Sequence, residues 1–212
     1  MRMAWSRPAR WVTNGNRVFW KCLATAASLL LLCNHALAYD AEAGRQKAEE
    51  TCAPCHGKAG ISELDTVPSI GGQWNDYVVL ALYQYRIGHR PSEVMGPLAQ
   101  PLADKDLGNL AAYYSSLKPW TPVRQPSAAS LAAGLALTQQ RNGVQCHAAG
   151  LPGQQSVPRI AGQRIEYLTT QLQGFRAGTR GDIDGNMSAA VKDLTDAEIA
   201  TLADYISGLS TP

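Results

Sequence analysis

Cys52-Ala53-Pro54-Cys55-His56 is the segment that decides how this sequence is interpreted. Cysteines three positions apart lie on one face of a helical turn, and here a histidine follows the second cysteine directly. This C-x-x-C-H spacing is typical of covalent haem attachment, because two thiols reach the vinyl groups of one haem while the histidine directs a ring nitrogen at its iron. We predict that Cys52 and Cys55 bind a c-type haem and that His56 ligates its iron.

A cysteine pair at this spacing also occurs in zinc sites and in redox-active dithiols. A zinc site needs further ligands, and no second cysteine pair lies in this part of the sequence. A thioredoxin-like dithiol belongs to a βαβ unit, whereas the surrounding sequence has helical periodicity. Haem attachment is therefore the favoured interpretation.

The sequence around this motif is repeated at a spacing of 90 to 92 residues. A duplication of this kind predicts two similar small domains of about 85 residues each. The matching pairs are Cys55-His56 with Cys146-His147, residues 68–73 with 158–163, Tyr77 with Tyr167, residues 85–90 with 175–180, and residues 102–117 with 194–209.

Helical periodicity dominates both repeats, and no convincing alternating strand is present. In residues 102–117 and 194–209 apolar side chains recur every three or four positions, and Thr195 with Glu198 forms a capping-box pattern. Two further segments predict helices, each followed by a glycine suited to a helix C-terminus. They are residues 74–86 and 164–176. The predicted fold class is all-α.

The N-terminus has the pattern of a secretory signal peptide. Its first 21 residues carry five basic residues and no acidic one, and the apolar run at residues 22–33 is too short to span a bilayer. Ala36-Leu37-Ala38 then supplies the small-x-small pattern at which signal peptidases cut. We predict cleavage before Tyr39 and export to the periplasm, with an uncleaved membrane anchor as the alternative.

The domain boundaries follow from the signal, the repeats and the prolines between them. Pro119, Pro122 and Pro126 predict an extended linker. The predicted order is a signal peptide at 1–38, a first domain at 39–118, a linker at 119–127 and a second domain at 128–212.

Residues 1–38 account for the positive net charge of the chain. They hold five of its 19 basic residues and none of its 17 acidic residues, so the predicted mature protein has a net charge of −3. This mild acidity argues against a nucleic-acid partner. The three remaining cysteines, Cys52, Cys55 and Cys146, are an odd number, which argues against a simple disulfide framework in an oxidising compartment.

Met95 and Met187 are the two methionines of the predicted mature chain, one in each repeat at equivalent positions. A methionine opposite a histidine fills the coordination sphere of iron and suits electron transfer rather than oxygen activation. Methionine more often fills a gap in a core, but that role gives no reason for matching positions. We predict that both are iron ligands. His89 aligns with Thr179, which favours a surface or haem-propionate contact over ligation.

The second repeat departs from the attachment pattern. It has Gly143 where the first cysteine is expected, so at most one thioether forms, through Cys146. Cys146, His147 and Met187 are then predicted to hold a second haem. The alternatives are a haem bound without the usual covalent machinery, or a domain that has lost its haem and serves as a structural or docking module.

Together these motifs make residues 39–212 similar to the periplasmic two-haem class I cytochromes c of the cytochrome c4 type. The resemblance implies two tandem class I cytochrome c domains, with His56 and His147 as proximal ligands and Met95 and Met187 as distal ligands. It further implies that the carbonyl groups of Pro68 and Pro158 accept hydrogen bonds from the ligand imidazoles. Gly143 departs from the family pattern at the second haem.

The implied function is electron transfer without catalysis. The expected partners are redox proteins, a donor and a terminal oxidase or reductase, including complexes at the membrane. A cytochrome subunit of a flavoprotein dehydrogenase has the same sequence pattern, and so does a one-haem carrier with a haem-free docking domain. A haem peroxidase is disfavoured, because it needs an open or displaceable iron site, whereas His/Met ligation closes both.

Overall fold

The computed structural model describes residues 39–122 and 124–210. Within these ranges the chain consists of helices and loops, with one isolated β-bridge between Gln154 and Val157. The predicted all-α class is therefore confirmed. The predicted signal peptide at 1–38 lies outside the described residues.

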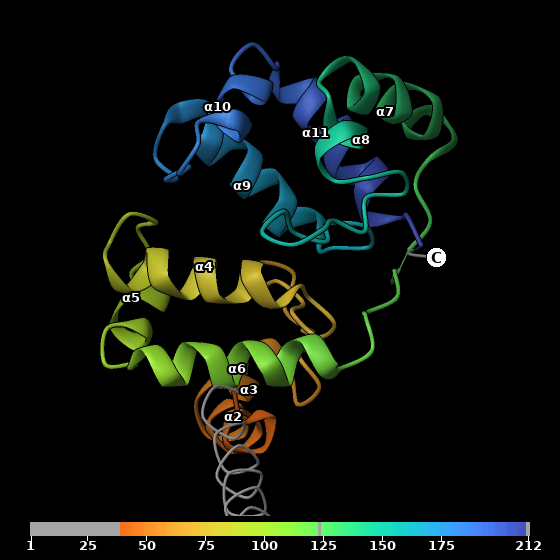
Figure 1. Ribbon diagram of the computed structural model, residues 1–212. Coiled ribbons are helices and arrows are strands. Elements are labelled where there is room, and N and C mark those ends of the chain that lie inside the picture. Colours follow the sequence, from red (N-terminus) through yellow and green to blue (C-terminus); the bar gives the residue numbers. More distant parts are fainter. Residues whose placement is uncertain (1–38, 123, 211–212) are drawn as a thin grey trace, which may run out of the picture. The chain divides into compact units, whose positions relative to one another are not determined.

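Two groups of helices follow one another along the chain (Figure 1). The first half contains α2 (Ala41–Lys47), η2 (Ala48–Cys52), α3 (Ala53–His56), α4 (Asn75–Arg86), α5 (Met95–Ala99) and α6 (Asp104–Ser116). The second half contains α7 (Ala128–Gln140), α8 (Gly143–Cys146), α9 (Ile165–Ala177), α10 (Asn186–Val191) and α11 (Asp196–Ser207).

The predicted helices exist, with ends that differ by one or two residues. Trp74 and Arg164 are the N-cap residues of α4 and α9, so each helix begins one residue later than the segment predicted from the sequence. The capping box before α11 is confirmed: Thr195 Oγ1 accepts from the Glu198 N–H (3.2 Å), and the Glu198 carboxylate accepts from the Thr195 N–H (2.8 Å). Gly178 ends α9 in the left-handed conformation.

Each half is closed by a contact between its first and its last helix. In the first half, α2 packs on α6 where Gly44 faces the backbone of Asn109. In the second half, α7 packs on α11 where Gly134 faces the side chain of Tyr205. A Cβ at either glycine would overlap these atoms, so both positions need glycine for the close approach of two helices.

We expect Gly134→Ala to destabilise the second half by about 1–3 kcal/mol, because the added methyl group pushes α7 away from α11. Urea unfolding followed by far-UV circular dichroism measures the change. The exposed Ala132→Ser on the same helix is the control, with a change below about 0.5 kcal/mol. A stability of Gly134→Ala equal to that of the control contradicts the packing argument.

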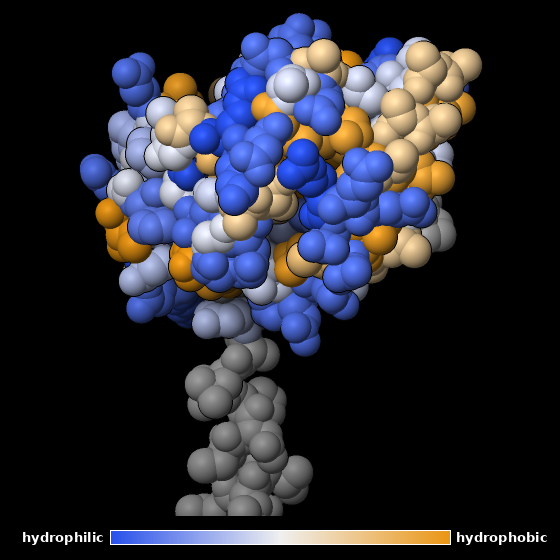
Figure 2. Space-filling model, turned by 90° about the horizontal axis from the view of Figure 1, so that it is seen from above, coloured by the Kyte–Doolittle hydropathy of each residue, from blue (hydrophilic) through white to orange (hydrophobic). Residues whose placement is uncertain are grey.

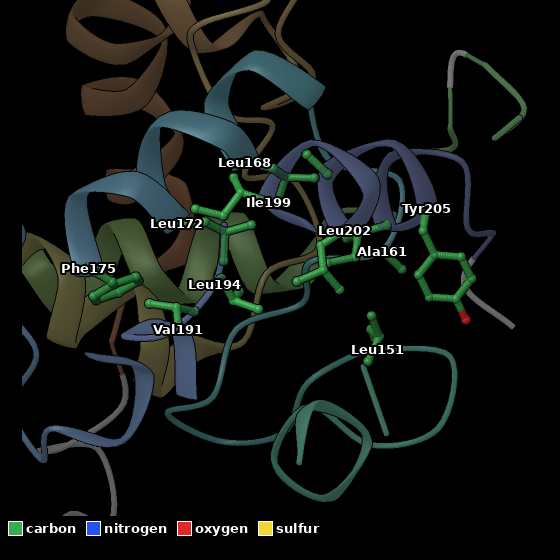
Figure 3. Packing of buried hydrophobic residues seen from close by; sticks show 12 residues of the cluster. Leu151, Ala161, Leu168, Leu172, Phe175, Val191, Leu194, Ile199, Leu202 and Tyr205 are labelled. Carbon is green, nitrogen blue, oxygen red and sulfur yellow. The ribbon is translucent and has the colours of Figure 1, made fainter. Parts of the chain in front are cut away.

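Two separate hydrophobic clusters form the cores of the halves. The cluster of the first half is built around Leu110, Tyr113 and Tyr114 of α6. The cluster of the second half extends from Phe175 and Leu172 on α9 to Leu202 on α11 (Figure 3). Because each half has its own buried cluster, the repeat of the sequence is also a repeat of core structure.

The segment between the halves is held against the second half. Trp120 is only 2% exposed, and its Nε1 donates to the carbonyl of Ala161 (2.9 Å). Further along, Arg124 forms an ion pair with Asp204 of α11, whose carboxylate also accepts from the Ser127 N–H (3.1 Å). The predicted linker is thus anchored at both ends by specific contacts.

The pKa of Asp204 is lowered by hydrogen bonds from Ser130, Arg124 and Ser127. A carboxyl group with a lowered folded-state pKa adds stability above its unfolded pKa of about 4, and this contribution is lost as the pH falls below that value. We expect Asp204→Asn to lose less stability than the parent protein between about pH 6 and about pH 3. Urea unfolding at the two pH values measures this, with the exposed Asp193→Asn as control. An unchanged pH dependence in Asp204→Asn contradicts the assignment.

The surface seen in Figure 2 is mostly hydrophilic, with hydrophobic residues in small separate groups. Leu131 and Leu135, one turn apart on α7, are both exposed. Within the described ranges, every helix is too short or too polar to cross a membrane.

Candidate haem sites

His56 and His147 occupy equivalent places in the two halves. His56 is the last residue of α3 and His147 follows α8 directly, and both rings are buried. His56 Nδ1 donates to the carbonyl of Pro68 (2.9 Å), and His147 Nδ1 donates to the carbonyl of Pro158 (2.9 Å). Both hydrogen bonds implied by the sequence resemblance are present. Because Nδ1 carries the proton, Nε2 keeps its lone pair for a metal.

Burial favours the neutral form of both rings. It lowers the pKa of His56 and of His147, and the hydrogen bonds to Pro68 and Pro158 offset only part of this shift. A neutral imidazole is the form that ligates a metal. Tautomer and protonation state therefore both suit ligation through Nε2.

The cysteine thiols lie beside these histidines and are free. Cys55 and Cys146 each precede a histidine directly and are exposed, whereas Cys52 is half-buried and packs against the core of the first half. Burial raises the pKa of the Cys52 thiol. Two thiols in the first half and one in the second are thus available for thioether formation.

The attachment segments of the halves differ in backbone as well as in sequence. In the first half, helix continues from α2 through η2 into α3, so Cys52 lies within a helix. In the second half, Asn142 adopts the left-handed conformation (φ 60°) and interrupts the helix just before Gly143. A Cβ at Gly143 would lie 2.7 Å from Cγ2 of Thr138 and 3.0 Å from its carbonyl oxygen. This position has no room for a cysteine unless Thr138 moves.

Met95 and Met187 each lie in the first turn of a short helix, in the half that contains the matching histidine. Met95 is the first residue of α5 and Met187 the second of α10. Both are half-buried, and Met187 packs against the hydrophobic cluster of the second half. Ser92 holds the start of α5, since its hydroxyl accepts from the Met95 N–H (3.0 Å).

Buried Arg90 and half-buried Arg180 form a cationic site that sequence reasoning missed. Arg90 is 4% exposed and donates to the Tyr167 hydroxyl (2.8 Å) and to Gln171 Oε1 (3.0 Å). Arg180 lies over the Phe175 ring, and its buried Nε has no hydrogen-bond partner. Among the residues that the structure describes, neither guanidinium pairs with a carboxylate.

The two arginine charges are close enough to act on one tyrosine. Burial raises the pKa of Tyr77, but the charges and hydrogen bonds of Arg90 and Arg180 together outweigh it and lower that pKa overall. Uncompensated buried charge is costly, so an anionic group fits this site. The only sequence signal was the recurrence of both arginines in the repeat. His89, the neighbour of Arg90, is exposed, as expected for a surface residue.

No protein-family model matches this chain. Among characterised proteins, it is 36% identical over 181 residues to cytochrome c4 of Thiocapsa roseopersicina, covering 81% of this chain and 93% of the relative. The chain belongs to the cytochrome c4 family. It is also 30% identical to a protein of Stutzerimonas stutzeri (strain A1501) named thiosulfate dehydrogenase electron acceptor, over 91% of this chain and 95% of that protein.

Solved structures support the same family. The crystal structure of reduced recombinant cytochrome c4 from Pseudomonas stutzeri superposes with a TM-score of 0.74 at 31% sequence identity, covering 81% of this chain and all of that chain. The predicted class of two tandem class I cytochrome c domains is thus confirmed. The protein is a two-haem electron-transfer cytochrome and not an enzyme.

The residues of this cytochrome fit haem c. Each domain offers a buried neutral histidine with a free Nε2 beside at least one free thiol. The cationic site of Arg90 and Arg180 suits the haem carboxylates. The first domain offers the full cysteine pair. The second offers one thiol, because a glycine without space for a side chain replaces the other.

We expect Gly143→Ala to destabilise the second domain by about 1–3 kcal/mol, because its methyl group meets Thr138. Thr138→Ser removes Cγ2 but keeps the hydroxyl that donates to the Gly134 carbonyl (2.6 Å), so it should recover part of the loss. A double-mutant cycle in urea unfolding isolates the coupling between the two positions. Additive effects contradict the steric explanation.

Proposed function

We propose that the two irons of this cytochrome are ligated by His56 with Met95 in the first domain and by His147 with Met187 in the second. The observation that carries this proposal is the same buried histidine–proline hydrogen bond in both domains, which directs Nε2 towards a ligand. The equivalent places of the two methionines at the starts of α5 and α10 support it.

Attachment differs between the domains in this proposal. Cys52 and Cys55 form two thioethers with the first haem, and Cys146 forms one with the second. The break at Asn142 and the crowding at Gly143 support a domain adapted to a single thioether rather than one that has only lost a thiol.

The protein supplies ligands, counter-charge and exclusion of water. Each bound haem supplies a one-electron iron centre, and two such centres in one chain suit the passage of electrons from a donor to an acceptor. Arg90 and Arg180 are proposed to bind the haem carboxylates, which would balance the buried charge of Arg90 and pair with the unsatisfied Nε of Arg180. His56 and His147 are both buried, so little of either ligand histidine is exposed to water.

The cellular setting follows from the N-terminus and the relatives. We propose that residues 1–38 are a cleaved signal peptide and that the mature protein, with domains at 39–118 and 128–212 joined by 119–127, works in the periplasm. One relative is named a thiosulfate dehydrogenase electron acceptor. A periplasmic dehydrogenase is accordingly proposed as donor, with a terminal oxidase or reductase as acceptor.

The haem content of protein produced with c-type maturation tests this proposal. The mass of the mature chain and a pyridine haemochrome assay should give two haems per chain, both retained after denaturation. Cys146→Ser should leave one retained haem, because it removes the single thioether of the second domain. Cys52→Ser is the matched control and should retain both, since Cys55 then holds the first haem as Cys146 holds the second. One haem per native chain contradicts the two-centre assignment.

A further inference from the structure

Gln73 and Gln163 connect the two domains through four hydrogen bonds. Their side chains are 3% and 4% exposed. Gln163 Nε2 donates to the carbonyl of Ser69 (2.9 Å), and Gln163 Oε1 accepts from the Ser69 N–H (2.9 Å). In the same way, Gln73 Nε2 donates to the carbonyl of Arg159 (3.0 Å), and Gln73 Oε1 accepts from the Arg159 N–H (2.8 Å). The two domains thus exchange equivalent contacts.

The peptide group that Gln163 contacts is also the one that holds a histidine. The Pro68 carbonyl and the Ser69 N–H belong to a single peptide unit. That carbonyl accepts the 2.9 Å hydrogen bond from His56 Nδ1, while the N–H donates to Gln163 Oε1. A continuous hydrogen-bonded chain therefore leads from His56 of the first domain to Gln163 of the second.

The reciprocal chain leads in the other direction. His147 Nδ1 donates to the Pro158 carbonyl (2.9 Å), and the Arg159 N–H of the same peptide unit donates to Gln73 Oε1 (2.8 Å). Each proximal histidine is therefore connected, through one peptide group, to a glutamine of the opposite domain.

Both glutamine side chains are fixed on their own domain as well. Gln73 Oε1 accepts a second hydrogen bond from the Trp74 N–H (3.0 Å), and Gln163 Oε1 accepts one from the Arg164 N–H (3.0 Å). These N–H groups lie at the caps of α4 and α9. Each amide is therefore held in place by a helix start, so its orientation does not depend on the partner peptide alone.

Hydrogen bonds in series polarise one another. When a peptide N–H donates, amide resonance moves electron density to the carbonyl oxygen, which becomes a better acceptor. A better acceptor at Nδ1 makes the imidazole a stronger electron donor at Nε2. A stronger donor favours ferric over ferrous iron and so lowers the reduction potential.

We propose that Gln73 and Gln163 are positioning residues that act across the domain boundary, each setting the electron donation of the proximal histidine in the opposite domain. Gln163 acts on His56 and Gln73 on His147. The inference rests on the proposed ligation of iron by these two histidines. Its consequence is that the potential of each centre depends on the docking of the other domain.

The test compares Gln163→Met and Gln73→Met in the two-haem protein. Methionine keeps the volume but removes the acceptor, so Gln163→Met should raise the potential of the first centre and Gln73→Met that of the second. Spectroelectrochemical titration measures both potentials. Met95→His and Met187→His each lower one potential and thereby assign the two centres.

A second variant and a second measurement separate positioning from loss of structure. Gln163→Glu keeps an acceptor on the Ser69 N–H and makes it stronger, so it should lower the first potential, opposite in sign to Gln163→Met. In ¹⁵N-histidine-labelled ferrous protein, Gln163→Met should also speed exchange of the His56 Nδ1 proton and leave that of His147 unchanged.

Trp74→Phe is the matched control. Trp74 Nε1 donates to the carbonyl of Pro152 (2.8 Å), which is another hydrogen bond between the domains but belongs to neither histidine–proline peptide. Loss of this hydrogen bond should weaken the interface and leave both reduction potentials unchanged.

The proposal is supported if each glutamine substitution changes the reduction potential of the centre in the opposite domain more than that of the centre in its own domain. Equal shifts at both centres, a larger shift in the substituted domain, no shift, or a shift of the same size in Trp74→Phe overturns it. A parent protein with fewer than two haems, or with another axial ligand, overturns the proposed function instead, and that result is visible before any variant is compared.

Discussion

The hydrogen bond from a buried histidine Nδ1 to a proline carbonyl is the interaction on which both sites depend. It fixes the tautomer and the ring orientation of His56, and the loop that supplies the carbonyl is itself tied to the cysteine turn. Ser69 Oγ accepts from the Ser62 N–H (3.1 Å), and Ser62 Oγ donates to the carbonyl of Cys55 (3.1 Å). The loop and the turn therefore hold each other, and the histidine is placed between them.

The halves share their helix order and core, yet they differ where the haem is attached. A cysteine substituted by glycine in a continuous helix would leave a gap at that position. Here Asn142 breaks the helix and Thr138 fills the space, so the backbone itself differs from that of the first half. The second site is thus a distinct attachment structure, in which His147 keeps the same proline contact while the preceding segment has changed.

The sequence was sufficient to predict what depends on local pattern and on the repeat. The fold class, the helices, the capping box at Thr195 and the histidine–proline contacts follow from spacing and from the family resemblance. The contacts of Gln73, Gln163 and Arg90 could not be predicted in this way, because they depend on how two domains dock. A repeat shows that the domains are alike but not which surfaces meet. One signal was present in the sequence: the same polar residue, glutamine, occupies equivalent positions in the two repeats, Gln73 in the first and Gln163 in the second. Core packing alone does not explain this match, because glutamine is not apolar.

Docking and haem binding are linked by the buried charge of Arg90. Its guanidinium donates to Tyr167 and Gln171 of the opposite domain, so it leaves water when the domains meet. Neutral hydroxyl and amide acceptors compensate only part of the cost of burying a charge. If haem carboxylates bind beside Arg90 and Arg180, as proposed, they supply the missing negative charge. Haem then stabilises the interface as well as each core, and the same interface brings each glutamine to the peptide behind the other domain's histidine. The interface that buries Arg90 thereby also couples the two centres.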